Sequence, residues 1–141
     1  MKVSILFALL AATLFVVLAR PFIDKGGVWS DEAIHGQLAV ELLAGEQSEA
    51  LHMRWGMKDT YQGAIKSFIL CIPFRLFGIS ADTMRWTTVA LGAVTVFAAA
   101  LLAGNLYGPI LGLYLGLLLA VDPALIGAMA SRLQQGPRTR P

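Results

Sequence analysis

Two stretches of the chain, residues 3–19 and 86–121, contain no charged residue. A helix that crosses the roughly 30 Å hydrocarbon core of a bilayer needs about 20 apolar residues. Residues 86–121 are too many for one crossing, and the Tyr-Gly-Pro sequence at 107–109 interrupts them, since Gly and Pro break helices. The pattern therefore predicts a hairpin of two transmembrane helices, 85–106 and 109–130, with Pro at the first position of the second helix.

Residues 3–19 fit two interpretations. One is a first transmembrane helix that begins in the cytoplasm after Lys2 and ends at Arg20. The other is a cleaved signal peptide with Val-Leu-Ala at 17–19 as its small-residue cleavage site. The apolar run exceeds the usual signal-peptide core of about 7–15 residues, which favours a retained helix. Both interpretations place the following segment outside the cytoplasm.

Residues 20–60 form the most polar part of the chain and are predicted to be an extracytoplasmic acidic loop. Within it, residues 31–44 read as a helix, because Ile34, Leu38 and Leu42 recur at helical spacing. Ser30 or Asp31 suits the N-cap, and Gly45 is expected to end the helix. We predict an amphipathic helix that lies near the membrane surface.

Residues 61–79 are apolar but interrupted by Lys66, Pro73 and Arg75. A cation at the centre of a transmembrane helix costs about 2.5–3.5 kcal/mol on insertion scales. Only residues 67–74 separate the two cations, which favours an interfacial or half-inserted helix, while a spanning helix stays open as the alternative.

Together these elements predict an all-α integral membrane protein of the inner (plasma) membrane, with residues 1–141 forming a single membrane-embedded fragment. It has three transmembrane helices, or four if residues 61–79 also span, and one or two surface helices in its external loop. Three crossings place the polar tail, residues 131–141, on the side of the acidic loop. Four crossings place this tail in the cytoplasm. Its arginines favour that side, because cytoplasmic segments carry an excess of Lys and Arg. The sequence leaves both counts open.

Composition agrees with a membrane environment and excludes some classes of function. The chain is 57% hydrophobic and 14% charged, against about 45–50% and about 25% in soluble domains. Its net charge is only +2 and its cations are scattered, so there is no basic surface for nucleic acid. Cys71 is the only cysteine, which rules out an internal disulfide and a zinc cluster of several cysteines.

The segment from Trp29 to His35 (Trp-Ser-Asp-Glu-Ala-Ile-His) holds the main candidate chemistry. Paired carboxylates at a helix start, Asp31 and Glu32, suit a general base or a ligand set for a divalent cation. Asp31 and His35 are four residues apart on a helix, so a shared metal is geometrically compatible. The plain alternative is an N-capping acidic turn on a solvated helix.

In its order of motifs the chain resembles the GT-C type glycosyltransferases. The closest resemblance is to the dolichyl-phosphate-mannose-protein mannosyltransferases and their bacterial relatives that transfer sugars or aminoarabinose from polyprenyl phosphate. After the first apolar helix, the matching features in order are Asp31-Glu32-Ala33, Tyr61-Gln62-Gly63-Ala64, Leu76-Phe77-Gly78-Ile79-Ser80, Met84-Arg85, Tyr107-Gly108, Pro123 and Ser131-Arg132. The resemblance covers essentially the whole chain; its single motifs are weak and their order is what makes it specific.

This resemblance implies transfer of a sugar from a membrane-bound polyprenyl-phosphate donor to an extracytoplasmic acceptor. It makes Asp31 the catalytic base and Glu32 its neighbour, and a divalent metal is compatible with the pair. In the family, the segment matching residues 61–79 is a second juxtamembrane helix. The family also carries an Asp shortly after the Ser-Arg pair, where this chain has Gln134 and Gln135. Relatives run to several hundred residues, so we expect an N-terminal fragment that is inactive alone.

Three cations are candidates for binding the lipid phosphate of the donor: Arg54, Lys58 and Arg132. Arg132 is also a potential partner of Asp122, an acid within the predicted last helix. Gly112 and Gly116 are expected to let helices pack closely. The alternative to an enzyme is a small non-enzymatic multi-pass membrane protein whose acidic loop binds a partner.

Overall fold

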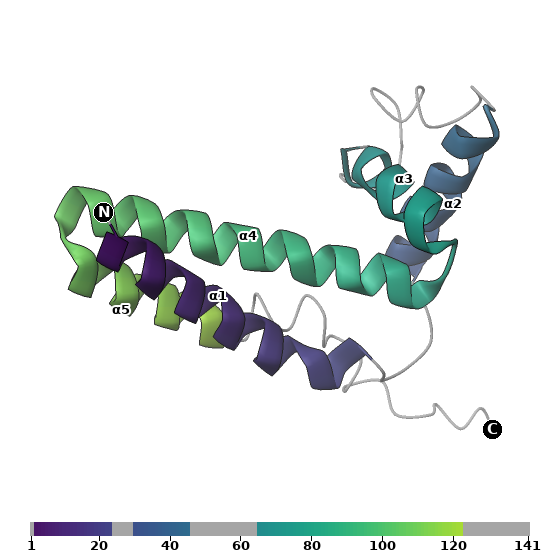
Figure 1. The fold of residues 1–141 in the computed structure, drawn as a ribbon. Coiled ribbons are helices and arrows are strands. Elements are labelled where there is room, and N and C mark those ends of the chain that lie inside the picture. Colours follow the sequence, from purple (N-terminus) through teal and green to yellow (C-terminus); the bar gives the residue numbers. More distant parts are fainter. Residues whose placement is uncertain (1, 24–29, 46–64, 123–141) are drawn as a thin grey trace, which may run out of the picture. The chain divides into compact units, whose positions relative to one another are not determined.

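The computed structural model describes residues 2–23, 30–45 and 65–122, and these residues form five helices and no strand (Figure 1). In chain order the helices are α1 (Lys2–Ile23), α2 (Ser30–Ala44), α3 (Ile65–Phe77), α4 (Ala81–Tyr107) and α5 (Pro109–Val121). The chain divides into two compact units. The first comprises residues 1–26 and 88–141, and the second comprises residues 27–87. The predicted all-helical class is confirmed.

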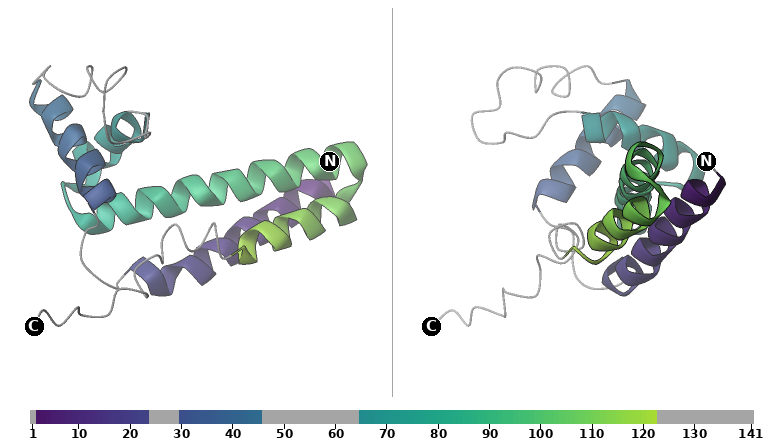
Figure 2. Two further views of the ribbon diagram at one scale, coloured as in Figure 1. Left: turned by 180° about the vertical axis from the view of Figure 1, so that it is seen from behind. Right: turned by 90° about the vertical axis from the view of Figure 1, so that its left-hand side faces the viewer.

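The first unit is built from α1, α5 and the part of α4 that follows Thr87. Helices α1 and α5 lie side by side (Figures 1 and 2). One face of α1 is fully buried, through Ala8, Ala11, Phe15 and Ala19, at the three- and four-residue spacing that aligns side chains on a helix. Ala11, Phe15 and Ala19 pack with Val96 of α4 and other buried apolar side chains. Helix α1 is therefore part of the core of this unit.

A tight turn joins α4 to α5. Gly108 has a φ of 102°, a conformation that only glycine adopts readily, and Pro109 then occupies the first turn of α5, as predicted. Beyond the turn, α5 approaches its neighbours through Gly112 and Gly116. A Cβ on Gly116 would lie 2.7 Å from the Cβ of Ala11 on α1. The expected close packing at these two glycines is confirmed.

Helix α5 ends at Val121, and Asp122 is extended, with φ −62° and ψ 116°. The physical reason is Pro123, since a residue before proline is disfavoured in the helical conformation. The remainder of the helix expected over 109–130 lies outside the described residues.

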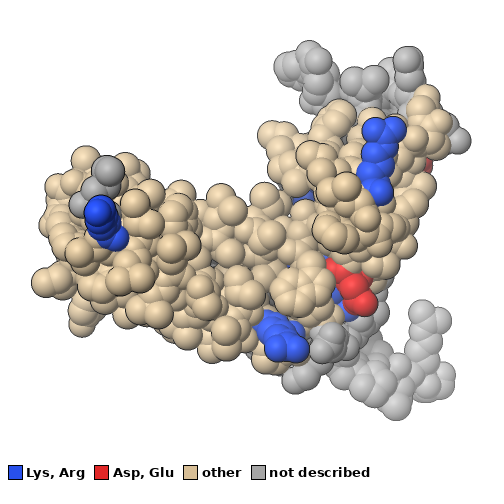
Figure 3. All heavy atoms as spheres, viewed as in Figure 1, with Lys and Arg blue, Asp and Glu red and all other residues tan. Residues whose placement is uncertain are grey.

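Two helices are long and apolar enough to cross a membrane, over residues 2–21 of α1 and over all of α4. The described part of α5 is apolar and shorter, with 13 residues. Charged side chains are few on the face shown in Figure 3. Helix α1 extends beyond the predicted 3–19, and α4 begins four residues before the predicted 85, at Ala81.

The second unit contains α2, α3 and the first turns of α4. Its core consists of Ala39, Leu70, Phe74 and Met84. Helix α2 matches the predicted 31–44 closely, and it ends at Gly45, whose φ is 77°. Helix α3 lies inside the predicted segment 61–79, and its 13 residues correspond to about 20 Å, less than the roughly 30 Å hydrocarbon core.

Candidate functional site

The two predicted catalytic residues lie in the first turn of α2. Asp31 and Glu32 directly follow Ser30, the first residue of that helix. The positive end of the helix dipole is there, which favours acidic groups. The side chains of Asp31 and Glu32 are outside the described part of the structure, as are the candidate phosphate-binding residues Arg54, Lys58 and Arg132. These five residues remain sequence predictions.

His35, one turn after Asp31, is buried between α2 and α3. Only 4% of its surface is exposed, and its Nδ1 lies 3.1 Å from the Oγ of Ser67, which is completely buried. The imidazole thus forms a hydrogen bond between the two helices. No group of three His, Cys, Asp or Glu side chains is placed to hold a metal ion within residues 2–23, 30–45 and 65–122. A histidine that is buried and hydrogen-bonded to Ser67 adds no support for a metal ion shared by Asp31 and His35.

Ser67 was not singled out from the sequence, although a signal for it exists. It is the only hydroxyl residue in the apolar stretch 65–77, and such a residue in a buried position requires a hydrogen-bond partner. His35 satisfies this requirement. Together His35 and Ser67 fix α2 against α3, and they thereby position the first turn of α2 that carries Asp31.

Cys71 lies one turn after Ser67 on the same side of α3. Its Sγ donates to the carbonyl oxygens of Ser67, at 3.3 Å, and of Ala39, at 3.7 Å. Burial raises the pKa of the Cys71 thiol, and a backbone hydrogen bond and the charge of Arg75 oppose that rise only in part. The thiol stays protonated at neutral pH, so Cys71 is a poor nucleophile.

Glu41 is the acidic residue of α2 whose side chain the structure describes. Its Oε1 accepts a 3.0 Å hydrogen bond from Nε2 of Gln37, and its Oε2 is buried and has no hydrogen-bond partner among the described residues. A buried carboxylate oxygen without a partner is costly. Glu41 lies six residues after His35 on α2.

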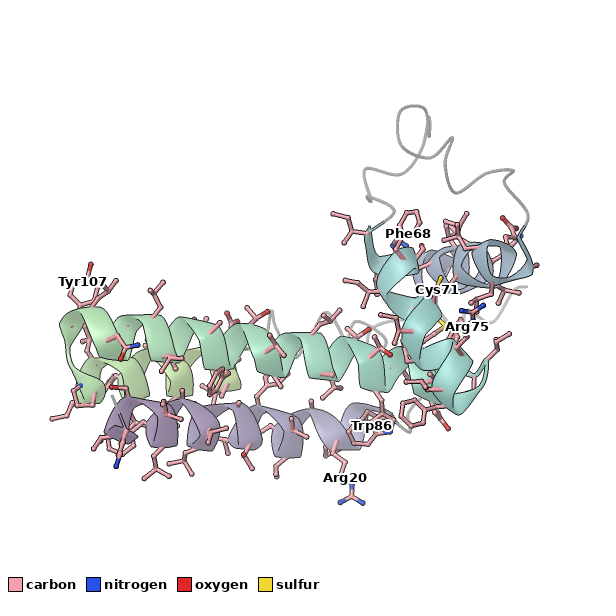
Figure 4. The ribbon with its side chains drawn as sticks, turned by 45° about the horizontal axis from the view of Figure 1, so that its top comes forward. Arg20, Phe68, Cys71, Arg75, Trp86 and Tyr107 are labelled. Carbon is pink, nitrogen blue, oxygen red and sulfur yellow. The ribbon has the colours of Figure 1, made fainter. Side chains whose placement is uncertain are left out.

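Asp122 follows α5 directly and is half-buried. Its proposed partner, Arg132, is outside the described residues. Trp86 belongs to a residue type that is enriched at membrane interfaces. It is 45% exposed in the second turn of α4, where the charged residues of that helix end (Figure 4).

Comparisons of the chain with protein-family models, with curated proteins and with solved structures returned no match. The resemblance to the GT-C type glycosyltransferases therefore rests on the ordered motifs of the sequence. Helix α2 begins at Ser30, and the contact between His35 and Ser67 joins it to α3.

Proposed function

We propose that the chain is a membrane protein in which α1 and α4 cross the bilayer. The support comes from the outward faces of these helices in the first unit, where large apolar side chains are exposed. Leu6 of α1 is 63% exposed, and Val94 and Leu102 of α4 are each 62% exposed. Exposing apolar area to water costs about 25 cal/mol per Å², whereas lipid solvates such a surface.

The burial of α1 in the first unit supports its retention as a transmembrane helix. Cleavage as a signal peptide would remove Phe15 and Ala11 from the buried apolar cluster that they form with Val96 and other residues of this unit. With Lys2 in the cytoplasm, the second unit then lies outside the cytoplasm. That side is where a transferase using a polyprenyl-phosphate sugar would meet its acceptor.

For the biochemical role, we propose that the chain forms part of a glycosyltransferase that uses a polyprenyl-phosphate sugar. The observation that carries this proposal is the start of α2 at Ser30, which puts Asp31 and Glu32 in its first turn, shortly after a candidate transmembrane helix. In this role Asp31 removes the proton from the acceptor hydroxyl. The cations Arg54, Lys58 and Arg132 neutralise the departing lipid phosphate.

The test is an Asp31→Asn substitution in the native gene, followed by assay of the membranes for transfer from radiolabelled polyprenyl-phosphate sugars. Asn has the size of Asp, and the loss of a first-turn charge costs a helix only about 0.3–1 kcal/mol, so folding is preserved while the base is lost. General-base catalysis is typically worth about 10²–10⁴-fold, and transfer should fall by about that factor at equal protein level.

Glu32→Gln serves as the matched control. It changes the neighbouring carboxylate to an amide and should have the smaller effect if Asp31 is the base. Near wild-type transfer in the Asp31→Asn membranes would mean that Asp31 is only an acidic residue of the first helical turn, and it would remove the main support for a transferase. Capture of a protein partner that requires Asp31, without any transfer, would favour the non-enzymatic alternative.

A further inference from the structure

We propose that the end of α5 at Asp122 lines a water-filled recess within the membrane, which opens to the extracytoplasmic side and attracts small cations. This inference rests on the proposed crossing of the membrane by α1 and α4. The observation behind it is the depth at which α5 ends, and the contacts of its glycines determine that depth.

The packing of α5 gives the level of Asp122 in the first unit. A Cβ on Gly116 would lie 2.9 Å from the Cβ of Ala100 on α4 and 2.7 Å from the Cβ of Ala11 on α1. Asp122 follows Gly116 by six residues, which correspond to about 9 Å along a helix. Because the tight turn makes α4 and α5 antiparallel, Asp122 lies near the level of Val94, six residues before Ala100.

This level lies inside the hydrocarbon region if α4 crosses the membrane. Val94 is eight residues after Trp86, where the uncharged run of α4 begins, and 13 residues before Tyr107, where α4 ends. These separations are about 12 Å and about 20 Å along the helix. The hydrogen bond from Ser4 to the carbonyl oxygen of Gly104 puts the end of α4 beside the start of α1, on the cytoplasmic side. The end of α5 is therefore nearer to the extracytoplasmic surface.

A helix that ends at this depth has polar backbone groups that lipid cannot satisfy. The backbone N–H of Asp122 bonds to the carbonyl oxygen of Leu119 at 3.3 Å, and the carbonyls of Ala120 and Val121 lie beyond this last bond. Non-helical backbone at membrane depth occurs only where protein buries it or where it lines a water-filled cavity. Val121 is 53% exposed and Asp122 is half-buried, so protein does not fully bury this end. Water is the remaining partner.

The recess opens to the extracytoplasmic side, because packing closes the opposite direction. Between the turn and its last residues, α5 has a buried face made of Gly112, Gly116 and Ala120. A Cβ on Gly112 would clash with the backbone of Gly104 on α4, so no water fits between these two helices there. The extracytoplasmic end of α4 is only about 12 Å away from the level of Asp122.

The groups at the end of α5 give the recess a negative charge. Asp122 is the only acidic residue of the first unit within residues 2–23 and 88–122. The negative end of the α5 dipole lies at the same place. Arg20, the described cation nearest in depth, has an exposed side chain on α1. In membrane transporters, the carbonyl ends of broken helices coordinate small cations. The end of α5 therefore favours a cation over an anion.

Cysteine accessibility in spheroplasts that express the full chain tests the recess. In a Cys71→Ala background, one cysteine is placed at Val121→Cys, beside Asp122. The matched control is Val94→Cys, at the same depth on the outward side of α4, where the native valine is 62% exposed. Two methanethiosulfonate reagents that do not cross membranes are added from outside, one with a trimethylammonium group and one with a sulfonate group. They react only with thiols that water reaches, and each rate is divided by that of the same reagent with free cysteine.

The recess predicts reaction at position 121 and protection at position 94, with both thiols reactive after denaturation in dodecyl sulfate. Protection of both positions in the folded protein would overturn the recess and leave the crossing by α4 intact. Reaction at both positions would overturn the crossing itself. Reaction at 121 only after the membranes are opened would place the entrance on the cytoplasmic side, which also contradicts the inference.

The preference for cations is tested by adding Asp122→Asn to the Val121→Cys protein. A single negative charge about 6 Å away in water changes the ratio of cationic to anionic rates by about tenfold. The cationic reagent should therefore react about tenfold faster, and Asp122→Asn should remove most of this difference while position 121 stays reactive. Asp82→Asn, in the first turn of α4, is the control and should leave the ratio unchanged. Equal rates of the two reagents in the protein that retains Asp122 would contradict the attraction of cations.

Discussion

A Cβ built on Gly112 of α5 would lie 2.6 Å from the Cα of Gly104 on α4. The two backbones are therefore in contact, and any side chain at Gly112 forces them apart. Ser4 of α1 adds to this contact, since its Oγ donates to the carbonyl oxygen of Gly104 at 3.4 Å. Three helices of the first unit meet at Gly104.

Gly112→Ala should destabilise this unit, because the clash is with backbone atoms that cannot move separately from their helices. Overpacking of this kind costs about 1–3 kcal/mol. Thermal unfolding in detergent, followed by loss of the monodisperse chromatographic peak, measures the effect. Ala98→Leu adds more volume on the exposed side of α4 and should be tolerated. Equal stability of the two variants would mean that α4 and α5 are not in contact at Gly112.

Phe15→Ala tests the place of α1 in the core. Phe15 is completely buried, and its ring lies over Gly92 of α4. Truncation of a buried Phe costs on the order of 3 kcal/mol, whereas Leu6→Ala, on the outward side of α1, should change the unfolding temperature little. If Phe15→Ala has no effect and the purified protein lacks residues 1–19 by intact mass, α1 is a signal peptide.

Ser67→Ala should loosen α2 from α3. It removes the hydrogen bond between Ser67 and His35 in a buried setting, where the loss of one partner costs about 1–3 kcal/mol. Hydrogen exchange of the α2 amides should speed up accordingly. Gln37→Ala, which removes an exposed bond within α2, is the control and should leave exchange nearly unchanged. Equal exchange rates of the α2 amides in the two variants would mean that the His35–Ser67 contact does not stabilise the packing of α2 on α3.

The raised pKa of Cys71 predicts slow alkylation. At neutral pH the thiol is protonated more fully than an ordinary cysteine, so maleimide should react with it more slowly than with a cysteine at Gln37 in a Cys71→Ala background. The rate at Cys71 should increase as the pH rises toward its pKa, and unfolding in dodecyl sulfate should abolish the difference. Equal rates at both positions in the folded protein would contradict the burial of Cys71.

The order and approximate bounds of the helices were predictable from the sequence, because uncharged runs, Gly45 and the Gly108-Pro109 turn mark them locally. The close approach at Gly112 was also expected from its spacing with Gly116. The pairing of His35 with Ser67 was not, since 32 residues separate them and no local pattern encodes such a contact. For the same reason the sequence could not assign His35 to packing instead of to metal binding. The roles of Asp31 and Glu32 depend on side chains outside the described residues.

The most direct test of the account is the side of the membrane on which α4 begins and ends. Alkaline phosphatase, which is active only outside the cytoplasm, is fused after Gly45 and, in a second variant, after Gly108. If α1 and α4 both cross the bilayer, the fusion after Gly45 is active and the fusion after Gly108 is inactive at matched expression. Equal activity of the two fusions would mean either that α4 does not cross or that α3 crosses as well. Both outcomes would contradict the membrane topology on which the proposed function depends.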